Sequence, residues 1–186
     1  MTVGLRISVF GPSGSGKTTL SRQIGAALNL PVIEFDAIHH LPNWQERPAD
    51  EFRAIVQQKL DGYHDGWVCD GNYRRVRDIV LPRADTVVWL RLPFRVVYWR
   101  LLARTMTRSW RREELWSGNR ESFRLAFFSR DSILLWGLTH FRAHFRNVGR
   151  DLATIPHQAT VHELRSAREV DDLLASLSAE RATSTS

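Results

Sequence analysis

The chain has 186 residues, a length that allows one well-buried core and makes a single domain the default expectation. Its 26 Lys and Arg residues against 20 Asp and Glu residues give a net charge of +6, no apolar run approaches the roughly 18 residues of a membrane helix, and the N-terminus does not have the form of a signal peptide. Cys69 is the single cysteine, so an internal disulfide is excluded. We therefore expect a cytoplasmic protein without a membrane-spanning segment.

The first predicted elements are a strand over Leu5–Phe10 and a helix over Thr19–Leu28, joined by a glycine-rich segment. This segment, Gly11–Thr18, satisfies the P-loop pattern G-x-x-x-x-G-K-[ST] in full, and a preceding strand and a following helix are the context that the pattern requires. Its glycines let backbone N–H groups converge on phosphate oxygens, and the helix N-terminus adds a partial positive charge. The sequence therefore predicts binding of a nucleoside triphosphate.

The chemistry of the P-loop side chains predicts their individual roles. Lys17 is expected to reach the β- and γ-phosphates, and the Thr18 hydroxyl is expected to hold Mg²⁺. ATP and Mg²⁺ are the expected cofactors. The residues predicted to contact the nucleotide are Gly11, Ser13, Gly14, Ser15, Gly16, Lys17, Thr18 and Thr19.

Short apolar runs alternate with stretches of helical spacing along the rest of the chain. The further predicted strands are Pro31–Asp36, Trp67–Asp70, Asp85–Leu92 and Gln158–Leu164. The further predicted helices are Pro48–Leu60, Phe94–Thr107, Glu121–Asn147 and Ala167–Leu177. Such alternation implies parallel strands with right-handed crossovers, so the predicted fold is a three-layer α/β P-loop NTPase domain with a five-stranded parallel sheet and helices on both faces.

Carboxylates stand at the predicted ends of the second and third strands, Asp36 and Asp70. In parallel sheets ligands gather at the carboxyl ends of the strands, so both are candidate site residues. Asp70 follows an apolar run and is a candidate Mg²⁺ ligand. Three roles stay open for Asp36: a general base for a hydroxyl acceptor, a second magnesium contact, and a cap of a helix or turn.

Positive charge is concentrated in one part of the chain. Twelve arginines lie between Phe94 and Arg150, against four acidic residues. In the helix that begins at Phe94, Arg100, Arg104 and Arg108 share one face. The arginines have three interpretations: a clamp for polyphosphate, a nucleic-acid contact, or, for most of them, a solvated surface.

Several segments resemble a known family. Asp70–Arg74, D-G-N-Y-R, resembles the D-G-F-P-R motif of adenylate kinases and related nucleotide kinases. Glu34–Trp44, Arg111–Glu121 and Asp131–Leu134 are similar to the adenylate-kinase-like proteins known as DNA topology modulation proteins. The resemblance extends over nearly the whole chain, to about Leu177.

The resemblance implies a nucleoside monophosphate kinase-like domain over residues 1–178 with a helical lid at about 108–121. It places Arg74 at the acceptor or transferred phosphate and Arg104 beside the donor base and the lid. The implied lid arginines are Arg108, Arg111, Arg112 and Arg120, of which Arg120 is the strongest candidate. Residues 179–186 are small and polar and are expected to form a flexible tail.

The expected activity is ATP- and Mg²⁺-dependent phosphoryl transfer to a nucleoside monophosphate or another small acceptor. A phosphate acceptor is already nucleophilic, whereas a hydroxyl acceptor benefits from a carboxylate near its proton. Asp36 suits the hydroxyl case and resembles the strand-two aspartate of shikimate and related small-molecule kinases. The predicted catalytic residues are Lys17, Asp36, Arg104 and Arg120, and the predicted substrate contacts are Asp36, Trp44, Asp70 and Arg74.

Aromatic and histidine side chains are assigned more local roles. Two roles stay open for Trp44: stacking on an acceptor ring and covering an edge of the core. His39 and His40 are adjacent and point in opposite directions in an extended segment, so they are not expected to share a metal. The tryptophans expected to pack helices are Trp110, Trp116 and Trp136.

A second hypothesis is a nucleotide-dependent regulator that acts on DNA topology. The basic half of the chain and the resemblance to topology modulation proteins support it. The sequence contains no helix-turn-helix, zinc finger or other recognised DNA-reading module, so the kinase hypothesis ranks first.

Overall fold

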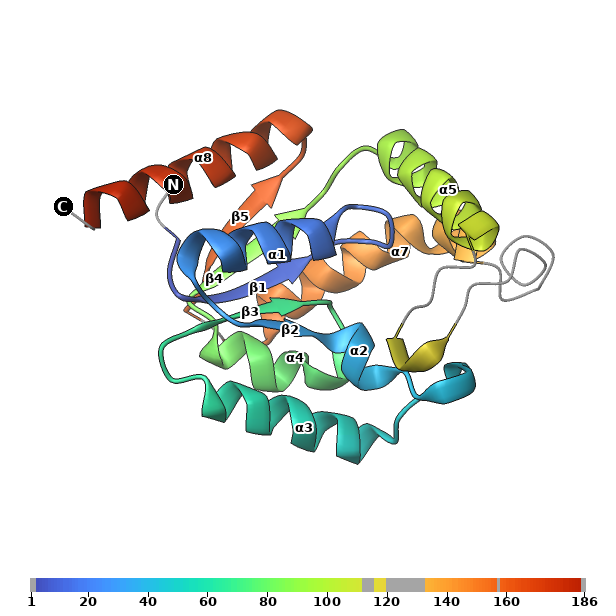
Figure 1. Cartoon of the computed structure of the whole chain (residues 1–186), viewed down its shortest axis with the longest axis horizontal. Helices are drawn as coiled ribbons and strands as arrows, with labels where there is room; N and C mark the ends of the chain where they lie inside the picture. Colours follow the sequence, from blue (N-terminus) through green and yellow to red (C-terminus); the bar gives the residue numbers. More distant parts are fainter. Residues whose placement is uncertain (1–2, 112–115, 120–132, 157, 185–186) are drawn as a thin grey trace.

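The computed structural model of the chain describes residues 3–111, 116–119, 133–156 and 158–184 (Figure 1). Five parallel strands form one sheet in the order β2-β3-β1-β4-β5. Their bounds are β1 Arg6–Phe10, β2 Val32–Glu34, β3 Trp67–Asp70, β4 Thr86–Leu90 and β5 Thr160–Leu164. The predicted α/β fold class and the five-stranded parallel sheet are confirmed.

Helices follow or precede each strand. Their bounds are α1 Lys17–Leu28, α2 Phe35–His39, α3 Ala49–Gly62, α4 Arg74–Val80, α5 Phe94–Arg111, α7 Ile133–Thr154 and α8 Ala167–Ser184. The short 3-10 turns are η1 Pro42–Trp44, η2 Leu81–Arg83 and η3 Trp116–Gly118. Within the described ranges, no helix combines the length and the hydrophobicity needed to cross a bilayer.

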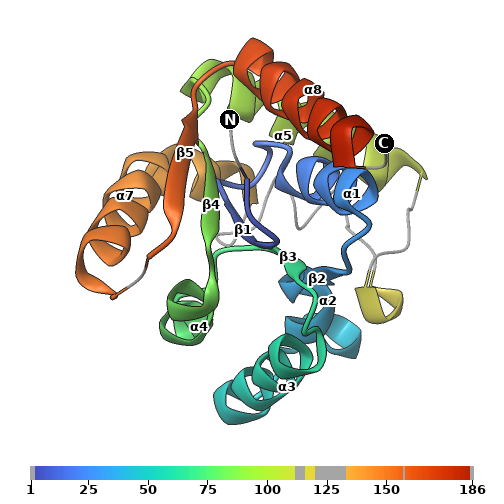
Figure 2. The ribbon, with the colours of Figure 1, turned by 90° about the vertical axis from the view of Figure 1, so that its left-hand side faces the viewer.

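The sheet is covered by helices on both faces. Figure 2 shows α1 and α8 on one side and α4 and α7 on the other. The side chains of β4 alternate between the two faces of the sheet: Val88 and Leu90 pack with α1 and α8, whereas Val87 and Trp89 pack with α7. Successive strand residues point to opposite faces, so an entirely buried strand such as β4 belongs inside a three-layer fold.

Helices α2 and α4 were not predicted, and several others extend beyond their predicted ends. Helix α4 has seven residues, too few for its apolar period to stand out in the sequence, although Val76, Ile79 and Val80 are buried. The last helix, α8, runs to Ser184 and so includes residues 179–184 of the expected tail, because no glycine or proline interrupts this stretch. Helix α7 continues to Thr154, beyond the predicted end at Asn147, and Val148 packs on the sheet.

A buried ion pair connects the two helices on one face of the sheet. Arg77 of α4 donates a hydrogen bond to the Asp151 carboxylate of α7, and both side chains are at most 10 % exposed. A second nitrogen of Arg77 donates to the carbonyl oxygen of Asn72 at 2.8 Å. The Arg77 guanidinium also lies over the Phe10 ring, 5.5 Å from its centroid. The pair therefore fixes α4, α7 and the loop that follows β3 relative to one another.

We expect Asp151→Ala to destabilise the protein by about 3 to 5 kcal/mol, because it leaves the buried Arg77 guanidinium without its partner carboxylate. Asp78→Ala is the matched control: Asp78 pairs with Arg53 at the surface, and its loss should cost less than about 1 kcal/mol. Urea unfolding at neutral pH measures both changes. An equal loss of unfolding free energy in the two variants would show that the buried pair stabilises the protein no more than the surface pair does.

Candidate active site

The P-loop, Gly11–Thr18, connects the central strand β1 to α1. Gly14 and Gly16 have φ angles of 85° and 95°, in the left-handed region that residues with a side chain rarely adopt. A β-carbon on Gly14 would also lie 2.7 Å from the carbonyl oxygen of Val97 and 2.8 Å from the β-carbon of Leu101. The glycines therefore permit both the turn of the loop and the close approach of α5.

Lys17 is the first residue of α1 and extends back along the loop. Its Nζ donates a hydrogen bond of 3.2 Å to the carbonyl oxygen of Pro12. Burial lowers the pKa of the Lys17 ammonium, while the negative charges of Asp70 and Asp36 raise it. The structure thus brings Lys17 together with both predicted carboxylates.

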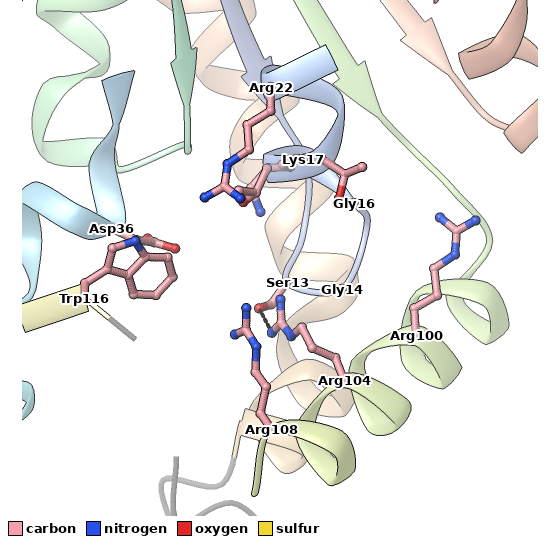
Figure 3. Close-up of a pocket in the computed structure, with 12 residues that line it drawn as sticks. Ser13, Gly14, Gly16, Lys17, Arg22, Asp36, Arg100, Arg104, Arg108 and Trp116 are labelled. Atoms are coloured by element: carbon pink, nitrogen blue, oxygen red, sulfur yellow. Dashed lines mark hydrogen bonds between the residues drawn. The ribbon is translucent and has the colours of Figure 1, made fainter. Parts of the chain in front are cut away.

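A cavity of 570 Å³ opens above the P-loop and against α5 (Figure 3). Among the described residues, its lining has five cationic side chains and one carboxylate, that of Asp36. This excess of positive charge suits a polyphosphate. The P-loop residues in the lining are Ser13, Gly14, Gly16, Lys17, Thr18 and Thr19, and the arginines are Arg22, Arg100, Arg104 and Arg108.

The arginines of α5 face the P-loop because they recur every four residues on one side of the helix. A guanidinium nitrogen of Arg104 donates to Ser13 Oγ at 3.2 Å, and one of Arg100 lies 3.5 Å from the Ser15 carbonyl oxygen. Figure 3 shows Arg108 beside Arg104 at the same cavity. These three arginines therefore form a cationic wall opposite the loop, with Arg100 still exposed to solvent.

Asp70 ends β3 and is buried next to Thr18, whose side chain hydrogen-bonds it. Burial raises the pKa of the Asp70 carboxyl, while the Thr18 hydrogen bond and the charge of Lys17 lower it. Oδ1 of Asp70 is buried and has no hydrogen-bond partner among the described residues, an arrangement that costs free energy unless a cation or water satisfies it. Thr18 and Asp70 therefore fit a Mg²⁺ ion.

Magnesium bound with a nucleotide needs few protein ligands, since phosphate oxygens and waters complete its octahedral shell. In the described part of the chain, no group of three or more His, Cys, Asp or Glu side chains is placed to hold a metal by itself. A metal at Thr18 and Asp70 would thus depend on the nucleotide for its remaining ligands.

Asp36 does not end a strand, contrary to the prediction. Strand β2 ends at Glu34, whose partner in the ladder, Asp70, is also the last residue of β3. Without a further partner the chain turns into α2, where Phe35 enters the core and Asp36 is the second helical residue. Asp36 nevertheless lines the cavity and accepts a hydrogen bond of 2.6 Å from the Tyr73 hydroxyl at Oδ1. Its side chain does not cap α2.

The remaining predicted substrate contacts lie elsewhere. Arg74 is the first residue of α4, so its side chain is directed to α7, where it pairs with Asp151 at 3.5 Å, and it does not line the cavity. Trp44 is in η1, packs edge-to-face against a neighbouring histidine and is also outside the cavity lining. Arg112 and Arg120 lie outside the described residues.

Trp116 lines the cavity next to Asp36 rather than packing between helices (Figure 3). Its indole nitrogen donates to one carboxylate oxygen of Glu34 at 3.3 Å, and Arg22 donates to the other oxygen at 2.8 Å. Glu34 therefore links α1 to η3. Sequence reasoning did not identify Glu34 as a site residue and assigned Trp116 to helix packing; the position of Glu34 two residues before Asp36 was the one available signal for it.

The turn η3 and the residue after it are joined to the segment after α2 by hydrogen bonds between their side chains and backbone groups of that segment. Ser117 Oγ donates to the His40 carbonyl oxygen at 2.7 Å, and Asn119 Nδ2 donates to that of Leu41 at 2.9 Å. The backbone N–H of Trp44 donates to Asn119 Oδ1 at 2.9 Å. These bonds hold η3, and with it Trp116, against a segment more than 70 residues away.

His144 of α7 is partly buried on the opposite side of the P-loop. The Asn72 side-chain amide lies 3.3 Å from its Nε2. Burial lowers the pKa of His144 to about 3, and the charges of Lys17 and Arg77 add to this effect. The imidazole is therefore neutral at physiological pH and accepts a hydrogen bond from Asn72.

Comparisons with known proteins agree with this architecture. The family model described as "ATPase family associated with various cellular activities (AAA)" matches residues 7–62, which contain the P-loop. A gluconokinase from Sinorhizobium meliloti 1021 is similar over 100% of both chains, at 19% identity and a TM-score of 0.53. A shikimate kinase from Acinetobacter baumannii in complex with shikimate is similar over 94% of this chain and 90% of its own, at 17% identity and a TM-score of 0.55. No curated protein sequence matches significantly.

At these identities the structural matches show the fold alone, which this chain shares with the gluconokinase and the shikimate kinase. The more specific resemblance to DNA topology modulation proteins is not shown by these matches and stays a prediction.

We expect His144→Gln to reduce the loss of stability at acid pH. Because the pKa of folded His144 is about 3 and that of an unfolded histidine is about 6.5, the unfolded chain binds the extra proton between these values and stability falls as pH decreases. Between pH 7 and pH 5, His144 should lower the free energy of unfolding of the native protein by up to about 2 kcal/mol. Urea unfolding at both pH values measures the difference; His39, whose pKa burial also lowers, contributes equally in both proteins. An unchanged pH dependence in the variant would contradict the prediction.

Proposed function

We propose that the protein is an ATP- and Mg²⁺-dependent phosphotransferase that transfers the γ-phosphoryl group to a hydroxyl of a small acceptor. The observation that carries this proposal is the 570 Å³ cavity, which joins Lys17, Thr18 and the arginines of α5 to Asp36. Groups suited to the phosphates of the donor and a carboxylate suited to an acceptor thus border the same space. The kinase fold shared with the gluconokinase and the shikimate kinase agrees with a small-molecule acceptor.

The donor has room for its nucleoside beside the phosphate site. A second cavity of 330 Å³ shares Gly16, Thr19 and Arg100 with the first. Its other lining includes Ser15, and Val170 of α8. The triphosphate would lie along the P-loop with its ribose and base in this second cavity, and the γ-phosphate would point toward Asp36.

The phosphate end of the donor is held by charge and by backbone. The P-loop N–H groups, Lys17, Arg100 and Arg104 would bind the phosphate oxygens and stabilise the charge that develops on the transferring group. When bound at Thr18 and Asp70, Mg²⁺ supplies further neutralisation of that charge. Little covalent chemistry is required of the protein, so positioning and electrostatics carry the reaction.

Asp36 favours a hydroxyl acceptor over a phosphate acceptor. A carboxylate next to an incoming phosphate dianion would repel it, whereas a carboxylate near a hydroxyl accepts its proton as the oxygen attacks. The new bond forms between the acceptor oxygen and the γ-phosphorus, the bond from that phosphorus to the bridging oxygen breaks, and the proton passes to Asp36. Trp116, beside Asp36, offers an apolar face to the carbon skeleton of the acceptor.

We expect Lys17→Ala to reduce phosphoryl transfer by at least about 100-fold while the protein stays folded, because it removes a charge that is directed at the phosphates. The chain has one other lysine, Lys59, which is exposed on α3, and Lys59→Ala is therefore the matched control. Coupled-enzyme detection of ADP and circular dichroism measure activity and folding. Normal turnover by Lys17→Ala would refute the kinase assignment.

A panel of nucleoside monophosphates, nucleosides, polyols and hydroxy acids tests the acceptor class. We expect ATP consumption with a hydroxyl compound, and a fall in kcat of about 100- to 10,000-fold for Asp36→Ala. Asp50→Ala, at an exposed position of α3, should leave the rate unchanged. Transfer to nucleoside monophosphates alone, with Asp36→Ala fully active, would show that the acceptor is a phosphate.

A further inference from the structure

Tyr73 lies behind Asp36 and does not line the cavity. It is the N-cap residue of α4, at the end of the loop that follows β3. Its hydroxyl donates the 2.6 Å hydrogen bond to Asp36 Oδ1, and Asp36 lines the cavity whereas Tyr73 does not. The bond engages one of the two carboxylate oxygens of Asp36.

The ring of Tyr73 is fixed by three aromatic neighbours. Its centroid lies 4.6 Å from that of His39, 5.3 Å from that of Phe52 and 6.4 Å from that of Phe35. These neighbours come from α2 and α3, and two of them are in the buried core beside β2 and β3. The hydroxyl therefore has one well-defined position, and it is the position at which Asp36 accepts.

The Tyr73 hydroxyl remains a donor over the working pH range. Burial raises its pKa well above the ordinary value, and the negative charge of Asp36 raises it further. A neutral phenol can give one proton to one hydrogen bond, and here Asp36 receives it.

One short loop serves both halves of the site. Asp70, at its start, contacts Thr18 on the phosphate side, and Tyr73, at its end, contacts Asp36 on the acceptor side. Between them, Asn72 is held by Arg77 through its carbonyl oxygen and by His144 through its amide. The distance between the metal-binding carboxylate and the acceptor carboxylate is thus set by a loop that is itself fixed at its centre.

We propose that Tyr73 is a positioning residue: it holds the Asp36 carboxylate in the orientation that directs Oδ2 at the acceptor hydroxyl. The proposal rests on the proposed kinase function. Without the tether, Asp36 can rotate about its side-chain bonds, and the hydroxyl loses the alignment that in-line attack on the γ-phosphorus requires. The ring of Tyr73 packs in the core, whereas its hydroxyl orients Asp36 for the reaction.

Tyr73→Phe separates the two roles, since it keeps the ring and removes the hydroxyl. We expect kcat with the hydroxyl acceptor to fall about 10- to 100-fold, while the KM for ATP stays within about twofold, because the donor contacts lie on the other wall of the cavity. Tyr63→Phe, at an exposed tyrosine after α3, is the matched control and should keep the full rate.

A double-mutant cycle with Asp36→Ala identifies the route of the effect. If Tyr73 acts through Asp36, Tyr73→Phe lowers kcat in the native background and has no further effect on the residual rate of Asp36→Ala. An unchanged kcat for Tyr73→Phe, or the same fold-loss in both backgrounds, would overturn the proposal and leave Tyr73 a core residue only.

Failure of the kinase assignment would appear differently, as absence of transfer to any acceptor by the native protein. The inference is then tested by the thermal midpoints of four proteins: the native protein, Tyr73→Phe, Asp36→Ala and the double variant. Tyr73→Phe should lower the midpoint in the native background and change it little in the Asp36→Ala background. An equal shift in both backgrounds would show that the hydroxyl does not hold Asp36.

Discussion

All five strands run in one direction, so the carboxyl ends of β1, β2 and β3 meet at one edge of the sheet. The P-loop follows β1, Glu34 ends β2 and Asp70 ends β3. Burial alone would lower the pKa of Lys17, but the lysine is placed next to carboxylates there, and the charged form of the Asp70 carboxyl is in turn favoured by Lys17 and by Thr18. The electrostatics of the site therefore depend on the parallel pairing of the strands.

Helix α5 completes the site because Gly14 lets it pass close to the loop. The spacing of Arg100, Arg104 and Arg108 then converts a charged helix face into the wall of a cavity. The opposite wall needs a different support: Arg77 and Asp151 hold α4 against α7, and the loop before α4 carries Tyr73 to Asp36. A buried ion pair outside the cavity thus helps to place a carboxylate inside it.

The residues around the P-loop could be predicted as neighbours because their signal is local. The P-loop, its flanking elements, Lys17, Thr18 and Asp70 were all identified from short patterns, and the structure brings them together. The surroundings of Asp36 were predicted less well. Arg74 was placed by motif resemblance, but the first turn of α4 directs it to Asp151. Trp116 was expected to pack helices, yet it reaches the cavity through Glu34, 82 residues away.

The sequence by itself determined the fold class, the nucleotide loop and the excess of arginine on one helix face, because strand alternation, glycine torsion angles and helical periodicity are properties of a few consecutive residues. Only the tertiary structure decided which carboxylates share a space with Lys17, which tryptophan borders them and which hydroxyl holds Asp36. Each of these contacts joins residues that are far apart in the chain. Their meeting depends on where the sheet places each loop, and a single sequence does not encode such pairs in any local pattern.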